Sequence, residues 1–180
     1  GLEAKDRIGE TPLHKASWKG HVDVVQLLVK YKVDLEVKDQ LGRTPLHSPS
    51  CFGHTDVARL LVELKVNPEA KDQNGAAPLH LASCFGKIDV VRLLVELKVD
   101  PEVKRYDGST PLHDASYHGH IDVVRLLAEH KVDLEAEDQH DRTPLRHACD
   151  RCRLPVICLL AESGVDMNTG HPLHFAAART

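Results

Sequence analysis

Aromatic residues are scarce in this chain, making up 4% of its 180 residues. A core of ordinary size must therefore be built from Leu, Val and Ala. The net charge at pH 7 is −4, which argues against a nucleic-acid-binding protein, because such a protein normally carries a clustered basic surface. No apolar run approaches the roughly 18 residues that a membrane-spanning helix needs. We therefore expect neither a nucleic-acid partner nor a membrane partner.

Catalytic motifs are also missing from the sequence. The chain has no Gly-x-Ser-x-Gly, no His-Glu-x-x-His and no complete EF-hand loop. Gly86-Lys87 lacks the upstream glycine that a phosphate-binding loop requires. The sequence therefore predicts that the protein is not an enzyme and binds no cofactor.

The five cysteines are an odd number without the spacing of a disulfide framework, which favours a reducing compartment. The start at Gly1, without a secretory signal, predicts an intracellular fragment from the cytoplasm or nucleus. Cys149 and Cys152 form a Cys-x-x-Cys pair, but a closed zinc site needs four ligands. His147 and Cys158 would have to reach the ion from a different helix face, so we expect no metal.

One short motif recurs at a fixed interval. Thr-Pro-Leu-His or a close variant begins at residues 11, 44, 77, 110 and 143, each 33 residues after the one before. A sixth copy, Pro172-Leu173-His174, comes five residues early. A constant period of this length predicts a repeat array in which each unit buries its apolar face against its neighbours.

The fourth unit illustrates the local pattern. It opens with the turn pair Asp107-Gly108, because glycine tolerates a positive φ. Thr110-Pro111 then starts a first helix, since Thr can cap the free N–H groups and Pro at the first position loses no bond. Gly119 ends this helix. A second helix begins near His120, with apolar residues at helical spacing, and an extended segment returns to the next turn.

This pattern resembles the ankyrin repeat, whose motif contains G-x-T-P-L-H-x-A followed by V-V-x-L-L. The blocks recur in register over the whole chain. The resemblance implies an all-α helical repeat, an ankyrin-repeat solenoid with β-hairpin or turn fingers, built from five repeats plus a partial sixth. We expect one domain over residues 1–180, with units at about 6–38, 39–71, 72–104, 105–137, 138–169 and 170–180. The resemblance also implies a monomeric protein-binding scaffold without catalytic residues.

Some positions depart from the family motif. Pro49 replaces an interior residue of a first helix, so we expect a distortion around Ser48 and Ser50. Asp141 and Cys152 occupy two glycine positions in the fifth unit. Lysine replaces the glycine after the second helix in four units, and a side chain held in the left-handed region costs roughly 1 kcal/mol. These lysines are Lys32, Lys65, Lys98 and Lys131.

Thirteen histidines invite a metal or acid–base role. However, most of them recur once per unit, whereas a catalytic group is needed only once in a protein. In the family that the motif resembles, these histidines bridge loops by hydrogen bonds, so we expect a structural role. They are His14, His47, His80, His113 and His174 in the Pro-Leu-His motif, and His21, His54 and His120 after the glycine.

The aromatic and arginine residues mark the candidate binding site. Trp18, Phe52, Phe85 and Tyr117 fall at the ends of first helices, beside positions that face a concave groove in this family. Trp, Tyr and Arg are enriched in binding hot spots, and exposed apolar patches usually mark a partner site. The alternative is that Phe52 and Phe85 pack against the adjacent second helix. The full candidate set is Trp18, Tyr31, Phe52, Phe85, Tyr106, Tyr117, His118, Arg7, Arg43, Arg142 and Arg151.

The sequence therefore predicts a non-catalytic module that binds a partner protein in a concave groove and at its hairpin tips. Two alternatives remain open. One is an adaptor that recruits a substrate to a larger complex such as a ubiquitin ligase, and the other is an engineered ankyrin-scaffold binder. Pro49 and Cys152 favour a natural sequence. The helix-like end His174-Phe175-Ala176-Ala177 predicts that the natural chain continues past Thr180.

Overall fold

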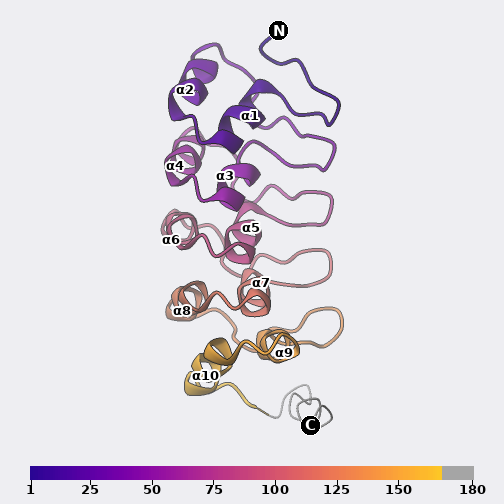
Figure 1. Cartoon of the computed structure of the whole chain (residues 1–180), viewed down its shortest axis with the longest axis vertical. Coiled ribbons are helices and arrows are strands. Elements are labelled where there is room, and N and C mark those ends of the chain that lie inside the picture. The colour runs from indigo at the N-terminus through magenta and orange to yellow at the C-terminus, as the bar shows by residue number, and fades with distance from the viewer. Residues whose placement is uncertain (168–180) are drawn as a thin grey trace.

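The structure is a computed structural model that describes residues 1–167 (Figure 1). The predicted partial sixth unit and His174 lie outside the described residues. Over residues 1–167 the chain forms ten helices and no β-strand. In chain order they are α1 (Pro12–Lys19), α2 (Val22–Lys30), α3 (His47–Phe52), α4 (Thr55–Glu63), α5 (Pro78–Cys84), α6 (Ile88–Glu96), α7 (Pro111–His118), α8 (Ile121–Glu129), α9 (Pro144–Asp150) and α10 (Leu154–Glu162).

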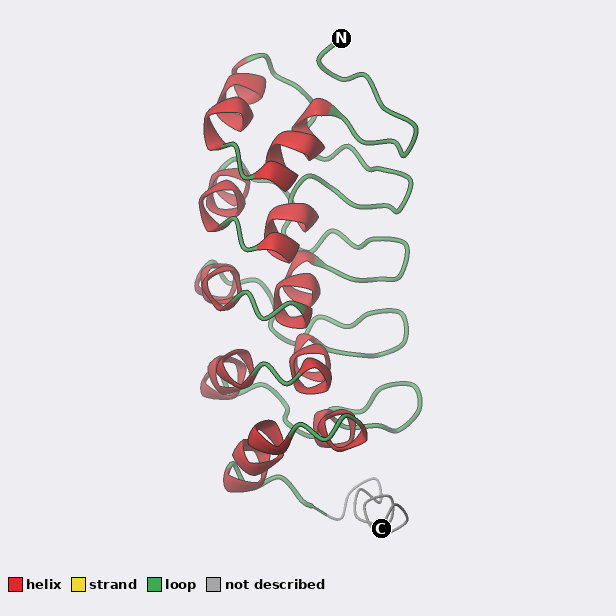
Figure 2. Ribbon diagram, in the orientation of Figure 1, coloured by secondary structure: helices red, strands yellow, loops and turns green. Residues whose placement is uncertain are grey.

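The helices form an elongated stack of pairs (Figure 1). The odd-numbered helices make an inner layer, the even-numbered helices an outer layer, and loops project as fingers from the inner side (Figure 2). Contacts run between successive inner helices, between successive outer helices and within each pair. The expectation of an all-helical repeat array is confirmed.

The fingers are loops, so of the two expected forms, β-hairpin or turn, the described residues show the turn. In the second finger, Asp39 N donates to Arg43 O at 3.0 Å and closes the turn. The Asp39 carboxylate accepts the N–H groups of Leu41 and Arg43, both at 2.8 Å. Gln40 joins this tip to the preceding one, with its backbone N donating to Ile8 O and its side-chain Nε2 donating to Arg7 O, both at 3.0 Å. Because each finger makes isolated bonds rather than a ladder, no strand forms.

The core is built from Leu, Val and Ala, as the composition predicts. Fully buried examples are Leu13, Leu46, Leu79, Leu112 and Leu145, which hold the same position in successive units. The described part of the chain has no Phe, Tyr or Trp among its buried residues. The aromatic side chains are therefore left for the surface.

Repeated histidines join each unit to the next. His80 Nδ1 accepts the backbone N–H of Ala77 at 3.2 Å, and His80 Nε2 donates to Ser109 O at 3.1 Å in the following finger. His14, His47 and His113 bridge in the same way, at 3.0, 3.2 and 3.0 Å to the next finger. The predicted structural role is confirmed for these four histidines. Burial lowers the pKa of His80 and of His113 to about 4, which keeps both rings neutral at pH 7.

The second inner helix, α3, accommodates Pro49 because it begins later in its unit than the other inner helices do. The other inner helices begin at the Pro of the repeated motif, whereas α3 begins at His47, two residues after Pro45. This shift places Pro49 in the first helical turn, where its missing N–H is not needed. Ser48 and Ser50 lie inside α3, so the predicted distortion at these two residues is wrong. What the unit loses instead is the first turn of its helix.

The predicted left-handed residues are confirmed. Lys32, Lys65, Lys98 and Lys131 have φ values of 56°, 67°, 66° and 58°. Asp141 and Cys152 also have positive φ, at 55° and 53°. Every unit therefore keeps the backbone that the glycines of the motif would favour, whichever residue it carries.

Candidate partner-binding face

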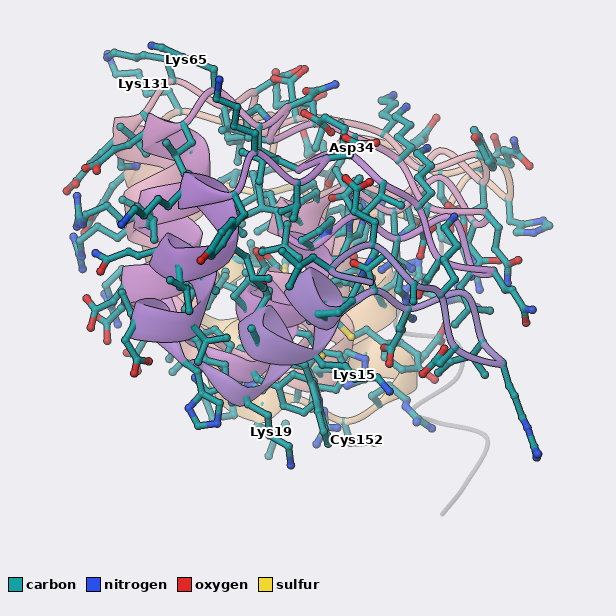
Figure 3. All side chains as sticks on the ribbon, turned by 90° about the horizontal axis from the view of Figure 1, so that it is seen from above. Lys15, Lys19, Asp34, Lys65, Lys131 and Cys152 are labelled. Atoms are coloured by element: carbon teal, nitrogen blue, oxygen red, sulfur yellow. The ribbon has the colours of Figure 1, made fainter. Side chains whose placement is uncertain are left out.

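Three columns of side chains on the inner helices form a continuous surface, which we call the inner face. Each column takes one residue from each of α1, α3, α5, α7 and α9, or, for Phe85 and Arg151, the residue just after the helix. The column nearest the fingers is Lys15, Ser48, Leu81, Asp114 and His147. The middle column is Trp18, Cys51, Cys84, Tyr117 and Asp150. The outer column is Lys19, Phe52, Phe85, His118 and Arg151. Viewed down the stack, Lys15, Lys19 and Cys152 lie on the same side of the molecule (Figure 3).

The inner face varies from unit to unit, whereas the column of residues directly behind it is constant in the first four units. Directly behind it, Ser17, Ser50, Ser83 and Ser116 occupy one fully buried column. Their small size lets successive inner helices pack closely. The side chains of the outer column, by contrast, are all exposed. The surface can therefore change from unit to unit without disturbing the stack.

The centre of the inner face is apolar. Phe52 and Phe85 are each 50% exposed and Trp18 is 41% exposed. The Trp18 and Phe52 rings meet edge to face, with centroids 6.0 Å apart. Phe52 also borders a shallow hollow of about 280 Å³ with Gly86, Lys87 and Ile88. Since half of each phenylalanine remains exposed, neither is buried against the neighbouring outer helix.

A cation stacks on an aromatic ring at both ends of the inner face. Lys19 Nζ lies 3.9 Å from the centre of the Trp18 ring. The guanidinium carbon of Arg151 lies 4.4 Å from the centre of the Tyr117 ring. Such contacts are worth about 0.5–1 kcal/mol at exposed sites. They hold the two cations at the surface rather than removing them from it.

Tyr117 lies between two histidine rings and beneath a guanidinium group. It is half-buried, with its ring centroid 5.0 Å from that of His118 and 5.9 Å from that of His147. Burial and the nearby charges of His120, Arg153 and Arg151 lower the pKa of His118. Tyr117 is thus partly structural, unlike the more exposed Trp18, Phe52 and Phe85.

The charged residues between the fingers and the inner helices are paired within the chain. Lys15 Nζ meets Asp6 Oδ2 at 2.8 Å, and Arg105 meets Asp114 Oδ2 at 2.8 Å. Asp138 contacts Arg142 at 2.8 Å and His147 at 3.0 Å. Burial raises the pKa of Asp138, but the hydrogen bonds from His147 and Arg142 outweigh it and hold this pKa below its usual range.

Several candidate residues lie apart from the inner face. Tyr31 directly precedes Lys32, and the equivalent Lys65 and Lys131 lie on the opposite side of the molecule from Lys19 (Figure 3). Arg7 and Tyr106 are exposed on fingers, with Tyr106 62% exposed. Arg43 and Arg142 also belong to fingers but face Asp72 at 3.8 Å and Asp138 at 2.8 Å. The structure therefore gathers Trp18, Phe52, Phe85, Tyr117, His118 and Arg151 on the inner face and leaves the other five outside it.

Lys15, Lys19, Arg105 and Asp114 were not among the predicted site residues, although the structure places them on or beside the inner face. One signal in the sequence could have found Arg105. The other four units carry Asp at this position (Asp6, Asp39, Asp72 and Asp138). A reversal of charge at one position of an array marks a unit whose contacts differ.

Metal-ligand groups, disulfides or membrane-spanning helices would indicate other roles for the described residues. Among them no group of three or more His, Cys, Asp or Glu side chains is placed to hold a metal ion. All five cysteines, Cys51 and Cys84 included, are free thiols. Within the same part of the chain, no helix is both long and apolar enough to cross a membrane.

The repeated helix pairs, the histidine bridges and the finger loops define an all-helical repeat array. The chain belongs to the ankyrin-repeat family: the family model for ankyrin repeats in three copies matches residues 1–72, 34–105, 63–138 and 79–171. No curated protein matched the sequence. Ankyrin repeats generally mediate protein–protein interactions, and the family is typically non-catalytic.

Proposed function

We propose that this chain is a non-catalytic, monomeric module that binds a partner protein along its inner face, with the fingers forming the rim of the site. The observation that carries the proposal is the exposed row of Trp18, Phe52 and Phe85. These rings lie on helices that the stack fixes in advance, so binding would not have to order the surface first. A protein uses large apolar side chains of this kind as interface anchors.

The same surface fits other partners less well. A nucleic-acid partner is disfavoured by the net charge of −4 and by the internal ion pairs of Arg43, Arg105 and Arg142. The five free cysteines favour a reducing compartment inside the cell, the cytoplasm or nucleus.

An adaptor that recruits a bound protein to a larger complex such as a ubiquitin ligase would use the same face, and it is the alternative function that we retain.

Site-specific photo-crosslinking tests the proposal. A benzophenone amino acid replaces Phe52 or Phe85, a change that keeps an aromatic ring at the surface, and replaces Tyr31 in a matched control on the opposite side. We expect Phe52 and Phe85 to capture the same cellular protein. Excess wild-type protein should compete for it, whereas the Trp18→Ala, Phe52→Ala, Phe85→Ala triple variant should not. Capture at Tyr31 alone would place the binding site elsewhere and contradict the proposal.

A further inference from the structure

We infer that the inner face takes a protein segment with an apolar centre and an acidic residue near each end. This inference rests on the proposed function and specifies its partner. The outer column begins with Lys19, continues with Phe52 and Phe85, and ends with His118 and Arg151. The column contains no carboxylate, although Asp and Glu outnumber Lys and Arg in the chain, 27 to 23.

The charges of the inner face are unequal once internal pairs are removed. Lys15 is paired with Asp6, Asp114 with Arg105 and Asp150 with Arg146, at 2.8, 2.8 and 2.9 Å. Lys19 and Arg151 make no ion pair within residues 1–167, and each instead lies over an aromatic ring. Two unneutralised cations therefore remain, one at each end. Their complement is a pair of carboxylates on the partner.

Nearby carboxylates of the outer helices accompany this face in the first four units but not in the fifth. Asp23, Asp56, Asp89 and Asp122 lie in the first turns of the outer helices next to this face, where the helix dipole stabilises them. Asp89 lines the same hollow as Phe52, so the middle of the surface carries no net excess of positive charge. In the fifth unit Pro155 holds this position instead. Arg151 therefore lacks a neighbouring carboxylate of this column. Burial first, and then the nearby charges of His120, Arg153 and Arg151, lower the pKa of His118.

The spacing of the repeats sets the length of the segment. Neighbouring helices pack about 8–10 Å apart, so Lys19 and Arg151, four units apart, are separated by roughly 32–40 Å. An extended chain rises about 3.3 Å per residue, and about 10–12 residues would cover this span. Phe52 and Phe85, one unit apart, would contact apolar side chains about three residues apart. The partner is thus an extended acidic–apolar–acidic segment.

Selection from a phage-displayed library of random peptides of about 16 residues tests this inference, with wild-type protein as bait. We expect selected peptides to carry Asp or Glu on both sides of an apolar centre. The charge-reversed variant Lys19→Glu, Arg151→Glu should bind those peptides about tenfold more weakly, because two surface attractions become repulsions. Selection on that variant should enrich Lys or Arg at the flanks. The matched control Lys30→Glu, Arg125→Glu makes the same charge change on outer helices and should leave binding unchanged.

The Phe52→Ala, Phe85→Ala variant separates the two proposals. If the selected peptides no longer bind this variant but bind the charge-reversed variant as tightly as wild type, the inference is overturned and the proposed function stands. Peptides that ignore both changes would contradict both. If the outer-helix control loses as much peptide affinity as the charge-reversed variant, the effect comes from net charge alone and the inference is overturned. Stronger binding of a single-stranded oligonucleotide than of any selected peptide, abolished by the charge reversal, would also overturn it, because aromatic and basic side chains can stack and neutralise nucleic acid. Thermal melts of every variant confirm that the fold is kept.

Discussion

The first and fourth units contain the same ion pair with the charges exchanged. In the first unit the finger supplies Asp6 and α1 supplies Lys15, whereas in the fourth the finger supplies Arg105 and α7 supplies Asp114. Both contacts are 2.8 Å long. The environments differ, since the side chains of the first pair are 54% and 32% exposed and those of the fourth are 22% and 12% exposed. One geometry thus supports a solvent-screened pair at one end of the stack and a desolvated pair further in.

The exchange changes the finger as well. Asp6 Oδ1 accepts the N–H groups of Ile8 and Glu10, both at 3.0 Å, and so fixes its turn. An arginine has no acceptor for this task. In the fourth finger Asp107 accepts the N–H of Ser109 at 3.0 Å instead. A unit can therefore reverse the charges of this pair and keep its shape if a neighbouring side chain accepts the backbone N–H groups of the turn.

The buried Arg105–Asp114 pair is less favourable than its short N–O distance suggests. Burial raises the pKa of Asp114 to about 7, and the Arg105 guanidinium lowers it only in part. Arg105 lies within ion-pair distance, yet among residues 1–167 Asp114 Oδ2 has no aligned hydrogen-bond partner. We conclude that desolvation dominates at this site and offsets much of the attraction between the two charges.

The largest effect is expected from breaking the fourth-unit pair. Arg105→Asp would set two carboxylates against each other in a desolvated site, and we expect a loss of about 3 kcal/mol in the free energy of unfolding at pH 8. Adding Asp114→Lys recreates the first-unit arrangement and should recover most of that loss. Urea unfolding of the two single variants and the double variant measures the coupling. As a control, Lys15→Ala in the exposed first-unit pair should cost far less. Failure of the double variant to recover would show that the two units are not interchangeable.

A second, smaller effect is the pH dependence of the same pair. The folded-state pKa of Asp114, about 7, lies above its ordinary value of 3.8, so the folded protein holds this proton more tightly than the unfolded chain. The contribution of Asp114 to stability is therefore full below pH 4 and falls as the pH rises towards 7. Asp114→Asn removes that dependence.

The measurement is the difference in unfolding free energy between wild type and Asp114→Asn across pH 4 to 8. Wild type should lose stability relative to the variant as the pH rises, and the difference should level off above pH 7. His80 and His113 titrate in the opposite sense, since their lowered pKa values mean that stability is lost as the pH falls. Both histidines are present in the two proteins, so their effect largely cancels in the difference. A constant difference would mean that Asp114 stays ionised throughout.

The sequence predicted the features that recur in every unit, but it predicted much less about the residues that differ between units. The period of the Pro-Leu-His motif fixed the helix pairs, and recurrence identified His80 and its equivalents as bridges, because a position kept in every unit must serve the contact between units. Pro49 was misjudged because a helix can move its start, which local propensity does not reveal. The Arg105–Asp114 pair was missed because it joins a finger to a helix nine residues away, and only the folded unit shows that they face each other.

The smallest effect concerns another position that differs between units. Lys98 follows α6 with a φ of 66°, whereas the fifth unit has Gly164 at the same place with a φ of 86°. A side chain in the left-handed region costs about 1–2 kcal/mol, and the greater freedom of glycine in the unfolded chain returns about 0.5–1 kcal/mol of that. We therefore expect Lys98→Gly to stabilise the protein by roughly 0.5–1 kcal/mol.

The reverse change, Gly164→Lys, is its matched partner. A Cβ atom at Gly164 would meet no described atom within 4 Å, so the added side chain has room and the cost should be conformational alone. The two substitutions should thus change the unfolding free energy by similar amounts with opposite signs, measured by urea unfolding of both variants. If Lys98→Gly leaves stability unchanged while Gly164→Lys lowers it, the lysine cation must be offsetting the backbone strain through the dipole at the end of α6. In that case lysine would be as stable as glycine after α6, whereas the same side chain would lower stability after α10.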